Sequence, residues 1–316
     1  MATKLISGSR VVAITGAARG IGLATAKAVH ATGAKVAIAD IDEAGAKAAA
    51  AALGDRAFGT FVDVTDAESF TAFVAAVERE LGPIDVLDNN AGIMPIGPFL
   101  DETPGTARRQ LEINVLGVLN GMKAVLPGML ERGRGHIFNT ASVAGKAPVP
   151  GGLTYAATKA AIVSATETAR VEYRGSGIDF TCVMPSFTNT DLVTGTKGTR
   201  FIKNAEPEDV AAAIVAAIEK PRNDIYVPGM LRAMIATQKF VTRGVRDALN
   251  RAIKADRAFL EIDQSARAGY ENRIAATPVK ELTAAPSDGT TTSAADAATP
   301  AVAGAPGTAR QTSSSD

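Results

Sequence analysis

Residues 10–22, RVVAITGAARGIG, give the clearest indication of how this chain folds. The first six are apolar or β-branched after Arg10, which is typical of a buried strand, and the last three begin a helical run. Between strand and helix, Gly16, Gly20 and Gly22 allow a tight turn and the close approach of a pyrophosphate to the helix amides. A phosphate-binding turn requires this context; the alternative is an ordinary turn between two elements.

Strand-like and helix-like runs alternate as far as residue 228. The strand candidates are residues 10–15, 35–40, 58–62, 84–88, 135–140, 178–184 and 224–227. The helix candidates are residues 20–32, 42–52, 66–81, 104–131, 153–174 and 207–219. Strands that alternate with helices form parallel βαβ units, and strands with few charges are buried on both faces. We therefore expect an α/β doubly wound parallel sheet with helices on both faces, whose ligands bind at the carboxyl ends of the strands.

Composition and charge exclude several classes of protein. The 316 residues include 33 basic and 33 acidic side chains, and this net charge of zero argues against nucleic acid as the main partner. One Cys excludes a disulfide framework, and with two His we assign no metal. No run approaches the roughly 20 apolar residues of a membrane span, and the start MATKLISGSR lacks the apolar segment of a secretory signal. A cytoplasmic protein is the expectation.

The chain divides by composition into three parts. We expect an α/β domain over residues 1–228, a basic amphipathic helical extension over 229–276 and a disordered tail over 277–316. Residues 230–257 carry seven basic and two acidic side chains, and their apolar residues predict one amphipathic helix. These apolar residues are Met234, Val241, Val245, Leu249 and Ile253. The helix either docks on an anionic membrane surface or packs on the core or a neighbouring subunit; we favour packing.

Asp40 ends the second predicted strand, eighteen residues after Gly22. A carboxylate at this place accepts hydrogen bonds from both hydroxyls of an adenosine ribose and repels a ribose 2′-phosphate, so it favours NAD over NADP. Arg19 points the other way, because its guanidinium could pair with that phosphate. We give Asp40 the greater weight, since its repulsion would be direct. The alternative is that Asp40 is only the N-cap of the next helix.

Two further strand ends suit the same kind of ligand. Asp63-Val64 ends the third strand, and Asn89-Asn90-Ala91-Gly92 ends the fourth. Small residues and amides at strand ends are what an adenine and a ribose need. Either group alone is uninformative, because Asn and Gly are also standard turn residues.

Tyr155 and Lys159 are candidates for the chemistry. They lie four residues apart at the start of the predicted helix 153–174, so they share one helix face. A cation near a phenol favours phenolate, which would lower the pKa of Tyr155 and make it a usable acid and base. Ser142, after the fifth strand, could donate to a carbonyl oxygen, and Asn114, inside a helix, needs partners.

These motifs, in this order and spacing, resemble the classical short-chain dehydrogenase/reductase family. The set is TGAARGIG, Asp40, NNAG, Asn114, Ser142 and YAATK, and the resemblance covers residues 9 to about 228. It implies a Rossmann-type sheet of seven strands and hydride transfer to or from a nicotinamide. It also implies an enzyme that acts on a CH–OH group with NAD(P), most simply NAD, and that forms homodimers or homotetramers.

The resemblance carries roles for individual residues. Tyr155 would be the proton donor or acceptor, Lys159 would bind the nicotinamide ribose and tune Tyr155, Ser142 would orient the substrate oxygen, and Asn114 would serve a proton relay through water. The implied cofactor contacts are Gly16, Arg19, Gly20, Ile21, Gly22, Asp40, Asp63, Val64, Asn90, Ala91, Gly92, Tyr155, Lys159, Pro185, Thr188 and Thr190.

Two positions depart from the family's pattern. Pro185 is followed by Ser186 where the family usually has Gly, which would narrow the room beside the nicotinamide. Asp88 stands in the fourth strand where an aliphatic residue is usual. A carboxylate there must be paired or solvated.

The loops beyond the strand ends predict an apolar substrate pocket. In the loops 93–103, 143–152 and 186–205, the candidates are Ile93, Met94, Ile96, Phe99, Val143, Val149, Phe187 and Leu192. A lipophilic alcohol or ketone is therefore favoured over a substrate with a fixed anion, although Lys197 and Arg200 lie in the third loop. The alternative is that these side chains only pack the loops.

Two other functions stay open. One is an NADPH-dependent carbonyl or 3-oxoacyl reductase, which is preferred if Asp40 does not face the ribose. The other is a non-catalytic dinucleotide-binding protein with a regulatory role. The presence of Ser142, Tyr155 and Lys159 together argues against a pure binding protein.

Overall fold

The computed structural model describes residues 10–196, 203–252, 257 and 259–276. The predicted disordered tail over 277–316 lies outside these residues, as do Lys197 and Arg200. One compact unit of the chain ends at residue 280, and every described residue belongs to it. The predicted domain boundary at residue 228 stays a prediction.

Seven strands form one sheet in which all neighbours run parallel, in the order β3-β2-β1-β4-β5-β6-β7. The strands are β1 Val11–Thr15, β2 Lys35–Asp40, β3 Ala57–Phe61, β4 Val86–Asn89, β5 Gly135–Thr140, β6 Ile178–Pro185 and β7 Asp224–Val227. All seven predicted strands are confirmed, and the sheet is the Rossmann-type doubly wound arrangement. The burial of β1 and β4 along their whole length explains their lack of polar alternation.

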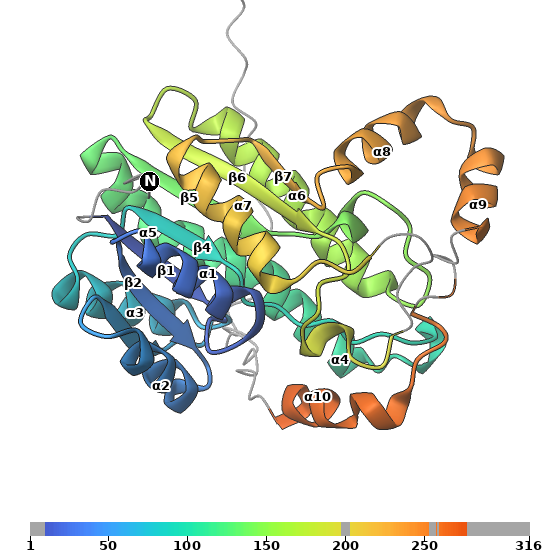
Figure 1. Cartoon of the computed structure of the whole chain (residues 1–316), viewed down its shortest axis with the longest axis horizontal. Helices are drawn as coiled ribbons and strands as arrows, with labels where there is room; N and C mark the ends of the chain where they lie inside the picture. The colour runs from blue at the N-terminus through green and yellow to red at the C-terminus, as the bar shows by residue number, and fades with distance from the viewer. Residues whose placement is uncertain (1–9, 197–202, 253–256, 258, 277–316) are drawn as a thin grey trace, which may run out of the picture. The chain divides into compact units, whose positions relative to one another are not determined.

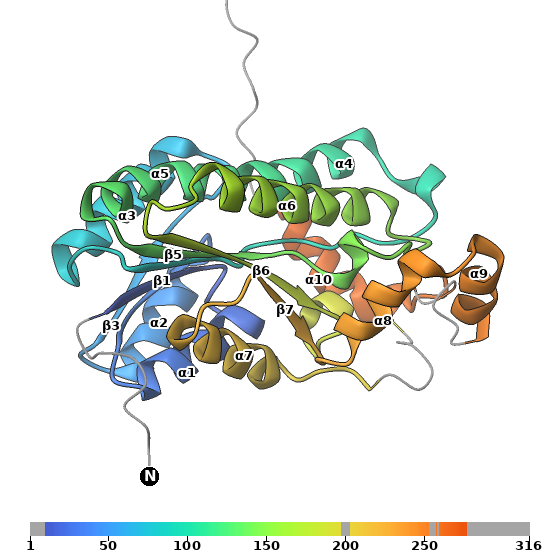
Figure 2. The ribbon, with the colours of Figure 1, turned by 90° about the horizontal axis from the view of Figure 1, so that it is seen from above.

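Helices cover both faces of this sheet, as Figures 1 and 2 show. The α-helices of the described residues are α1 Gly20–Ala31, α2 Glu43–Leu53, α3 Ala67–Glu80, α4 Pro104–Leu111, α5 Gly117–Arg132, α6 Leu153–Glu172, α7 Pro207–Glu219, α8 Leu231–Thr237, α9 Arg243–Ala252 and α10 Gln264–Ala276. Helices α1, α2 and α7 share an apolar core that includes Val29, Ala50 and Ile214. Helices α3, α5 and α6 enclose a second core on the other face.

The strand order reverses beside β1, which lies between β2 and β4. The chain runs from β1 outward to β3 and then returns to β4 on the other side. In an open α/β sheet, the crevice at the carboxyl ends of the strands at this point is where ligands bind. The glycine turn, Asp40 and Asn90 all lie at this edge.

The predicted helix over residues 104–131 is not uniform. Helix α4 passes through a π-helical turn, Glu112–Leu116, into α5. Of the described residues, the run Pro104–Arg132 alone is long and apolar enough to cross a membrane, and half of its most apolar window is buried. Because Met122 and Val125 of this run belong to the core, we interpret it as a helix that packs on the sheet.

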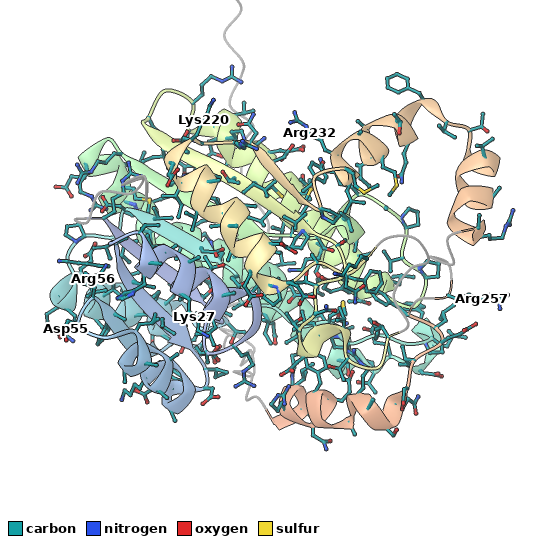
Figure 3. All side chains as sticks on the ribbon, in the orientation of Figure 1. Lys27, Asp55, Arg56, Lys220, Arg232 and Arg257 are labelled. Atoms are coloured by element: carbon teal, nitrogen blue, oxygen red, sulfur yellow. The ribbon has the colours of Figure 1, made fainter. Side chains whose placement is uncertain are left out.

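The single helix predicted over residues 230–257 is wrong. Helix α8 ends at Thr237, a 3-10 turn and an extended Val241 follow, and α9 begins at Arg243. β-Branched Val241 and Thr242 lower the helix propensity there. Leu231 of α8 is buried whereas Val245 of α9 is 59% exposed, so the two halves do not bury one face. Figure 3 shows Arg232 and Arg257 at the surface of this region.

Candidate active site

The turn after β1 runs so close to its neighbours that it excludes side chains. Gly16 has a φ of +63°, and a Cβ there would lie 2.7 Å from the Cα of Ala91. A Cβ on Gly22 would lie 2.5 Å from the carbonyl oxygen of Gly16. Gly16, Gly20 and Ile21 line the main cavity, so the N-terminus of α1 opens onto it.

Asn90 braces this turn from the end of β4. Its Nδ2 donates hydrogen bonds to the carbonyl oxygens of Thr15 (2.9 Å) and Gly16 (3.0 Å). The backbone amides of Asn90 and Ala91 both lie 3.2 Å from the Thr15 hydroxyl, which accepts from them. The Asn90 side chain therefore holds the glycine turn as well as lining the cavity, a structural role that the sequence did not indicate.

Asp40 lies at the edge of the cavity and is held by backbone amides. Its Oδ2 accepts from the amide of Ala18 and its Oδ1 from the amide of Asp42, each at 3.0 Å. The N-cap of α2 is Asp42, whose side chain accepts from the Gly45 amide, so the alternative of Asp40 as that N-cap is wrong. The guanidinium of Arg19 pairs with Asp42, and both side chains are partly exposed.

Asp63 and Val64 follow β3 and line the cavity. One Asp63 oxygen accepts from both the amide (2.9 Å) and the hydroxyl (2.7 Å) of Thr65. The Val64 carbonyl accepts from Asn120 of α5 at 2.9 Å. The structure thus brings the residues predicted for an adenosine site to one wall of one cavity.

Tyr155 and Lys159 share a buried face of α6, as their spacing predicted. The Lys159 Nζ lies 5.7 Å from the centre of the Tyr155 ring and donates to the Thr140 carbonyl at 2.7 Å. A Cβ on Gly92 would lie 3.4 Å from the same Nζ. The ends of β4 and β5 therefore meet at this ammonium group.

The electrostatics of this pair differ from the expectation. Burial raises the pKa of Tyr155 to about 12, and a hydrogen bond with Ser142 lowers it in part. Burial lowers the pKa of Lys159 to about 8. The prediction that Lys159 lowers the pKa of Tyr155 is wrong here, because burial dominates and the ammonium is engaged by Thr140.

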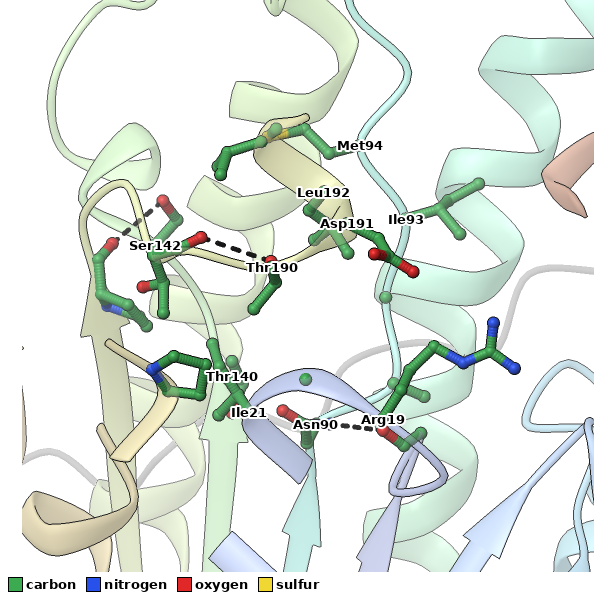
Figure 4. Close-up of a pocket in the computed structure, with 18 of the residues that line it drawn as sticks. Arg19, Ile21, Asn90, Ile93, Met94, Thr140, Ser142, Thr190, Asp191 and Leu192 are labelled. Atoms are coloured by element: carbon green, nitrogen blue, oxygen red, sulfur yellow. Dashed lines mark hydrogen bonds between the residues drawn. The ribbon is translucent and has the colours of Figure 1, made fainter. Parts of the chain in front are cut away.

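Ser142 connects the ends of β5 and β6 beside Tyr155. Its hydroxyl accepts from the amide of Ala144 at 3.1 Å and donates to the carbonyl of Pro185 at 3.3 Å. A Cβ on Gly20 would lie 3.4 Å from the Thr190 methyl, so the loop after β6 meets the glycine turn across the cavity. Pro185 and Thr188 line the same space. Figure 4 shows Asn90 and Arg19 at one end and Ser142, Met94 and Leu192 towards the other.

Asn114 lies in the π-helical turn and is fully buried. Its side-chain oxygen accepts from the Ile93 amide (2.8 Å), and its Nδ2 donates to the Ile93 carbonyl (2.9 Å) and the Thr158 hydroxyl (3.1 Å). The side chain therefore positions the loop after β4 and the start of α6. π-Helical turns often occur at functional sites, but the relay role of Asn114 stays a prediction.

One cavity of about 900 Å³ runs from the glycine turn past Tyr155 to the predicted substrate loops. Six of the eight predicted substrate residues line it: Ile93, Met94, Val143, Val149, Phe187 and Leu192. Ile96 packs against a buried cluster that includes Met94 and Tyr155, without lining the cavity. Phe99 is more than half exposed. Phe99 and Ile96 are thus corrections to the predicted pocket, because the loop after β4 turns outward at the 3-10 turn Phe99–Asp101.

Sequence reasoning missed the residues that close this cavity. Phe259, Tyr270, Arg273 and Ile274 line it, and they come from the segment that follows α9. The apolar residues Phe259, Leu260 and Ile262 are a sequence signal for a packed segment there, but not for a wall of this cavity. Their distance along the chain from Tyr155 left no local pattern by which to place them.

The two departures from the family's pattern both lie in buried positions. Asp88 has no exposed surface; one oxygen lies 3.4 Å from the Thr140 hydroxyl and the other has no partner in the structure. Burial raises its pKa to about 7, and the Thr140 hydrogen bond opposes that rise. The expectation of a paired or solvated carboxylate is therefore wrong, since burial favours the neutral form. Ser186 lines the cavity, and its hydroxyl also lacks a partner.

The described residues contain no group of three His, Cys, Asp or Glu side chains arranged for a metal ion. Burial raises the pKa of Cys182 to about 12, and it lies inside β6 as a small core residue. His136 is buried in β5, where burial lowers its pKa to about 3.

A doubly wound sheet with a glycine turn and a buried Ser-Tyr-Lys set defines a class of dinucleotide-dependent enzymes. Comparison with known proteins agrees: the sequence profile of the short chain dehydrogenases matches residues 10–200. The chain belongs to the short chain dehydrogenase family. It is 45% identical over 178 residues to a galactitol 2-dehydrogenase of Agrobacterium fabrum, a match that covers 56% of this chain and 70% of that protein.

Solved structures share the fold and are similar in sequence. A short chain dehydrogenase/reductase of Burkholderia phymatum in complex with NAD is 28% identical, with a TM-score of 0.66 over 72% of this chain and 92% of that one. A 3-ketoacyl-(acyl-carrier-protein) reductase of Brucella melitensis complexed with NADH is 29% identical, with a TM-score of 0.63 over 69% of this chain and 96% of that one.

Proposed function

We propose that this protein is an NAD-dependent oxidoreductase that interconverts a lipophilic secondary alcohol and its ketone, with Tyr155 as the general acid and base. The observation that carries this proposal is the continuity of one cavity. It begins at the glycine turn beside Asp40 and ends at an apolar chamber, and Ser142, Tyr155 and Lys159 lie between the two.

The residues present fit a dinucleotide. A Cβ on Gly16 or Gly22 would clash with backbone atoms. The two glycines therefore leave a cradle at the N-terminus of α1 that suits a pyrophosphate. Asp40 would hold the adenosine ribose, with Asp63 and Val64 beside the adenine. The residues beyond Thr140 would hold the other half: Lys159, Pro185, Thr188 and Thr190. When bound there, the nicotinamide supplies the hydride acceptor or donor.

The choice of NAD over NADP rests on charge. The Asp40 carboxylate would repel a 2′-phosphate on a ribose bound beside it, and Asp42 adds a second negative charge nearby. Arg19 already pairs with Asp42, which weakens the argument that it serves a phosphate. An NADPH-dependent carbonyl or 3-oxoacyl reductase is the second candidate. The 3-ketoacyl reductase among the similar structures favours the reductase reaction, but its complex holds NADH and so does not favour NADPH.

Side chains of this protein would transfer the proton to or from the substrate oxygen. Ser142 would donate a hydrogen bond to the substrate oxygen in place of Pro185, and it lies within reach of Tyr155. Tyr155 would give its proton to a ketone oxygen or take one from an alcohol. Lys159, held by Thr140, would orient the ribose and supply a positive charge beside the phenol.

The experiment measures reduced-cofactor formation on a panel of secondary alcohols, with NAD and NADP, for wild type, Tyr155→Phe and Asp40→Ala. We expect turnover with NAD, its loss in Tyr155→Phe by a factor of about 100 or more, and improved use of NADP in Asp40→Ala. Unchanged cofactor choice in Asp40→Ala would favour the NADPH-dependent reductase. Binding of NAD without turnover of any alcohol or ketone would favour a non-catalytic regulatory protein. A cytoplasmic location remains part of the proposal.

A further inference from the structure

The segment after α9 forms a wall of the substrate chamber. Phe259, Tyr270 and Ile274 line the cavity at its apolar end, although the family profile ends at residue 200. Helix α10 lies beside α4 in Figure 1, where Arg109 donates to the Ile274 carbonyl. The family's shared motifs therefore do not extend to this wall.

Tyr270 faces the chamber from the first half of α10. Its hydroxyl accepts a hydrogen bond from the Met94 amide at 2.7 Å, and its side chain is buried. Met94 belongs to the same buried apolar cluster as Tyr155. Burial raises the pKa of Tyr270 above its usual range, and the nearby Tyr155 adds to the rise. Tyr270 and Tyr155 therefore line the same cavity.

Arg267 fixes α10 against the loops that follow β4 and β6. Its side chain is 1% exposed, which is rare for an arginine, yet its guanidinium is well provided with acceptors. It donates to the carbonyls of Met94 (2.6 Å), Leu192 (2.8 Å) and Thr194 (3.1 Å) and pairs with Glu271 at 2.9 Å. Arg267 also lies over the Tyr270 ring, 4.8 Å from its centre. A shift of α10 would leave a buried charge without partners, so the wall is held firmly.

The rest of the wall is apolar. Phe259 is buried against Phe187, with ring centres 5.1 Å apart in an edge-to-face arrangement. Its backbone lies so close to Gly151 that a Cβ there would be 2.6 Å from the Phe259 carbonyl oxygen. The charged side chain among the chamber's C-terminal residues, Arg273, pairs with Asp191. Among the described residues of this wall, none offers an unpaired cation to a fixed anion on the substrate.

We propose that Tyr270 is a specificity-determining residue whose ring closes the substrate chamber opposite Tyr155 and restricts it to compact lipophilic alcohols and ketones. This proposal rests on the proposed function for the reaction itself. It adds that substrate length is set by the C-terminal segment of this chain, fixed in place by Arg267. A long acyl chain would have to displace the Tyr270 ring and break its hydrogen bond to Met94.

The test compares wild type with Tyr270→Ala and Tyr270→Leu across unbranched 2-alkanols and 2-ketones of increasing chain length. Tyr173→Ala is the matched control, because Tyr173 packs against Phe180 and does not line the cavity. Circular dichroism and NADH binding establish that each variant is folded. Tyr270→Leu keeps an apolar side chain in place, so it serves if Tyr270→Ala does not fold.

Two readings are taken for every variant. One is kcat/KM across the series, and the other is ketone binding with NADH present, measured as a thermal shift without turnover. We expect Tyr270→Ala to raise the ratio of long-chain to short-chain kcat/KM by about 10-fold or more, since one methylene in an apolar pocket has an effect of that order. Ketone binding should move in the same direction, and Tyr173→Ala should keep the wild-type ratio.

The outcomes separate the two proposals. If turnover occurs but the length ratio is the same in wild type and both Tyr270 variants, the Tyr270 proposal is overturned and the oxidoreductase stands. If ketones bind with a length preference that Tyr270→Ala shifts, but nothing is turned over, the chamber stands and the proposed reaction falls. An equal change in Tyr173→Ala would also overturn the Tyr270 proposal, because it would show a general loss of packing.

Discussion

Asp88 is a buried acidic side chain in the middle of the sheet, where few groups are available to hydrogen-bond with it. It pairs in register with Ile14 of β1 and Phe138 of β5, and one of its oxygens has no partner in the structure. The folded protein therefore favours the neutral carboxyl, with a pKa of about 7 against 3.8 for an unburied Asp. An acid with a raised folded pKa stabilises the fold fully below its unfolded pKa and loses that contribution as the pH rises through about 7.

We predict that Asp88→Asn removes a pH-dependent loss of stability. Between about pH 4 and pH 8, wild type should lose on the order of 3 kcal/mol relative to Asp88→Asn. Urea unfolding at both pH values measures the difference. Asp55→Asn is the control, because Asp55 is exposed at the surface (Figure 3) and should keep the wild-type dependence. A constant gap between Asp88→Asn and wild type at the two pH values would contradict the prediction.

Tyr155 should impose a pH dependence on catalysis. Because burial raises its pKa to about 12, the phenol is protonated near neutral pH, which suits proton donation to a ketone. Alcohol oxidation needs the deprotonated form, so its kcat/KM should rise by close to a factor of 10 for each pH unit from about pH 6 to about pH 8. Initial rates with saturating NAD measure this. A flat profile in wild type, or a steep one in Tyr155→Phe, would exclude Tyr155 as the titrating group.

At the scale of elements, the glycine turn and α1 act as one unit. A Cβ on Gly22 would clash with the carbonyl oxygen of Gly16. Because that oxygen is a backbone atom, no movement of a flexible side chain could relieve the clash. The Asn90 Nδ2, which braces the same turn, would lie 2.7 Å from a Cβ on Gly22. One added methyl group would therefore disturb both the turn and its brace.

We predict that Gly22→Ala weakens NADH binding by about 10-fold or more, because each 1.4 kcal/mol of strain costs that factor. The melting temperature should fall as well. Isothermal titration and thermal unfolding measure the two effects. Gly105→Ala makes the same chemical change in the first turn of α4, where the nearest atom to a Cβ is 3.8 Å away. That variant should bind NADH as wild type does; equal losses in both would argue against the close contact as the cause.

At the scale of the whole molecule, apolar side chains remain exposed on neighbouring helices. Leu111 of α4, Leu153 and Val171 of α6 and Leu116 beside α5 are all between 43% and 62% exposed. Helices α4 and α6 contact each other. Water in contact with so much apolar surface is unfavourable, which favours cover by a second copy of the chain. The expected homodimer or homotetramer would supply that cover.

We predict that Leu116→Glu shifts the protein towards monomers. The charge would have to be buried in the interface, so association should weaken at least 10-fold. Size-exclusion chromatography with light scattering over a range of concentrations measures the shift. Phe61→Glu is the control, since Phe61 is also partly exposed but ends β3 at the far edge of the sheet. A wild-type protein that is monomeric at all concentrations would contradict the expectation.

The role of the exposed α8–α9 region, membrane docking or packing, stays a prediction. Leu231 and Ile235 of α8 are buried, but Phe240 is 90% exposed and Val245 is also exposed. Docking of α9 on an anionic membrane and packing on a neighbouring subunit therefore both remain predictions. Co-sedimentation of Val245→Glu and wild type with anionic vesicles distinguishes them, because only membrane docking would make the two differ without a change in oligomeric state.

Three features could be predicted from the sequence: the sheet, the glycine turn and the pairing of Tyr155 with Lys159. Each of these rests on a local pattern: apolar runs between helices, glycines between a strand and a helix, and a spacing of four residues. Such patterns are read within a few residues, and the structure changes their ends but not their nature. Asp40 and Asn90 belong to the same class, since strand ends of a parallel sheet meet at one edge.

The folded chain was needed to identify the residues that close the substrate chamber and the pKa values of the buried groups. The hydrogen bonds from Arg267 to Met94 and from Met94 to Tyr270 join residues 173 and 176 positions apart. No local pattern encodes such a contact, because it depends on how the C-terminal segment folds back on the sheet. The raised pKa values of Asp88 and Tyr155 have the same origin: burial is a property of everything packed around a group.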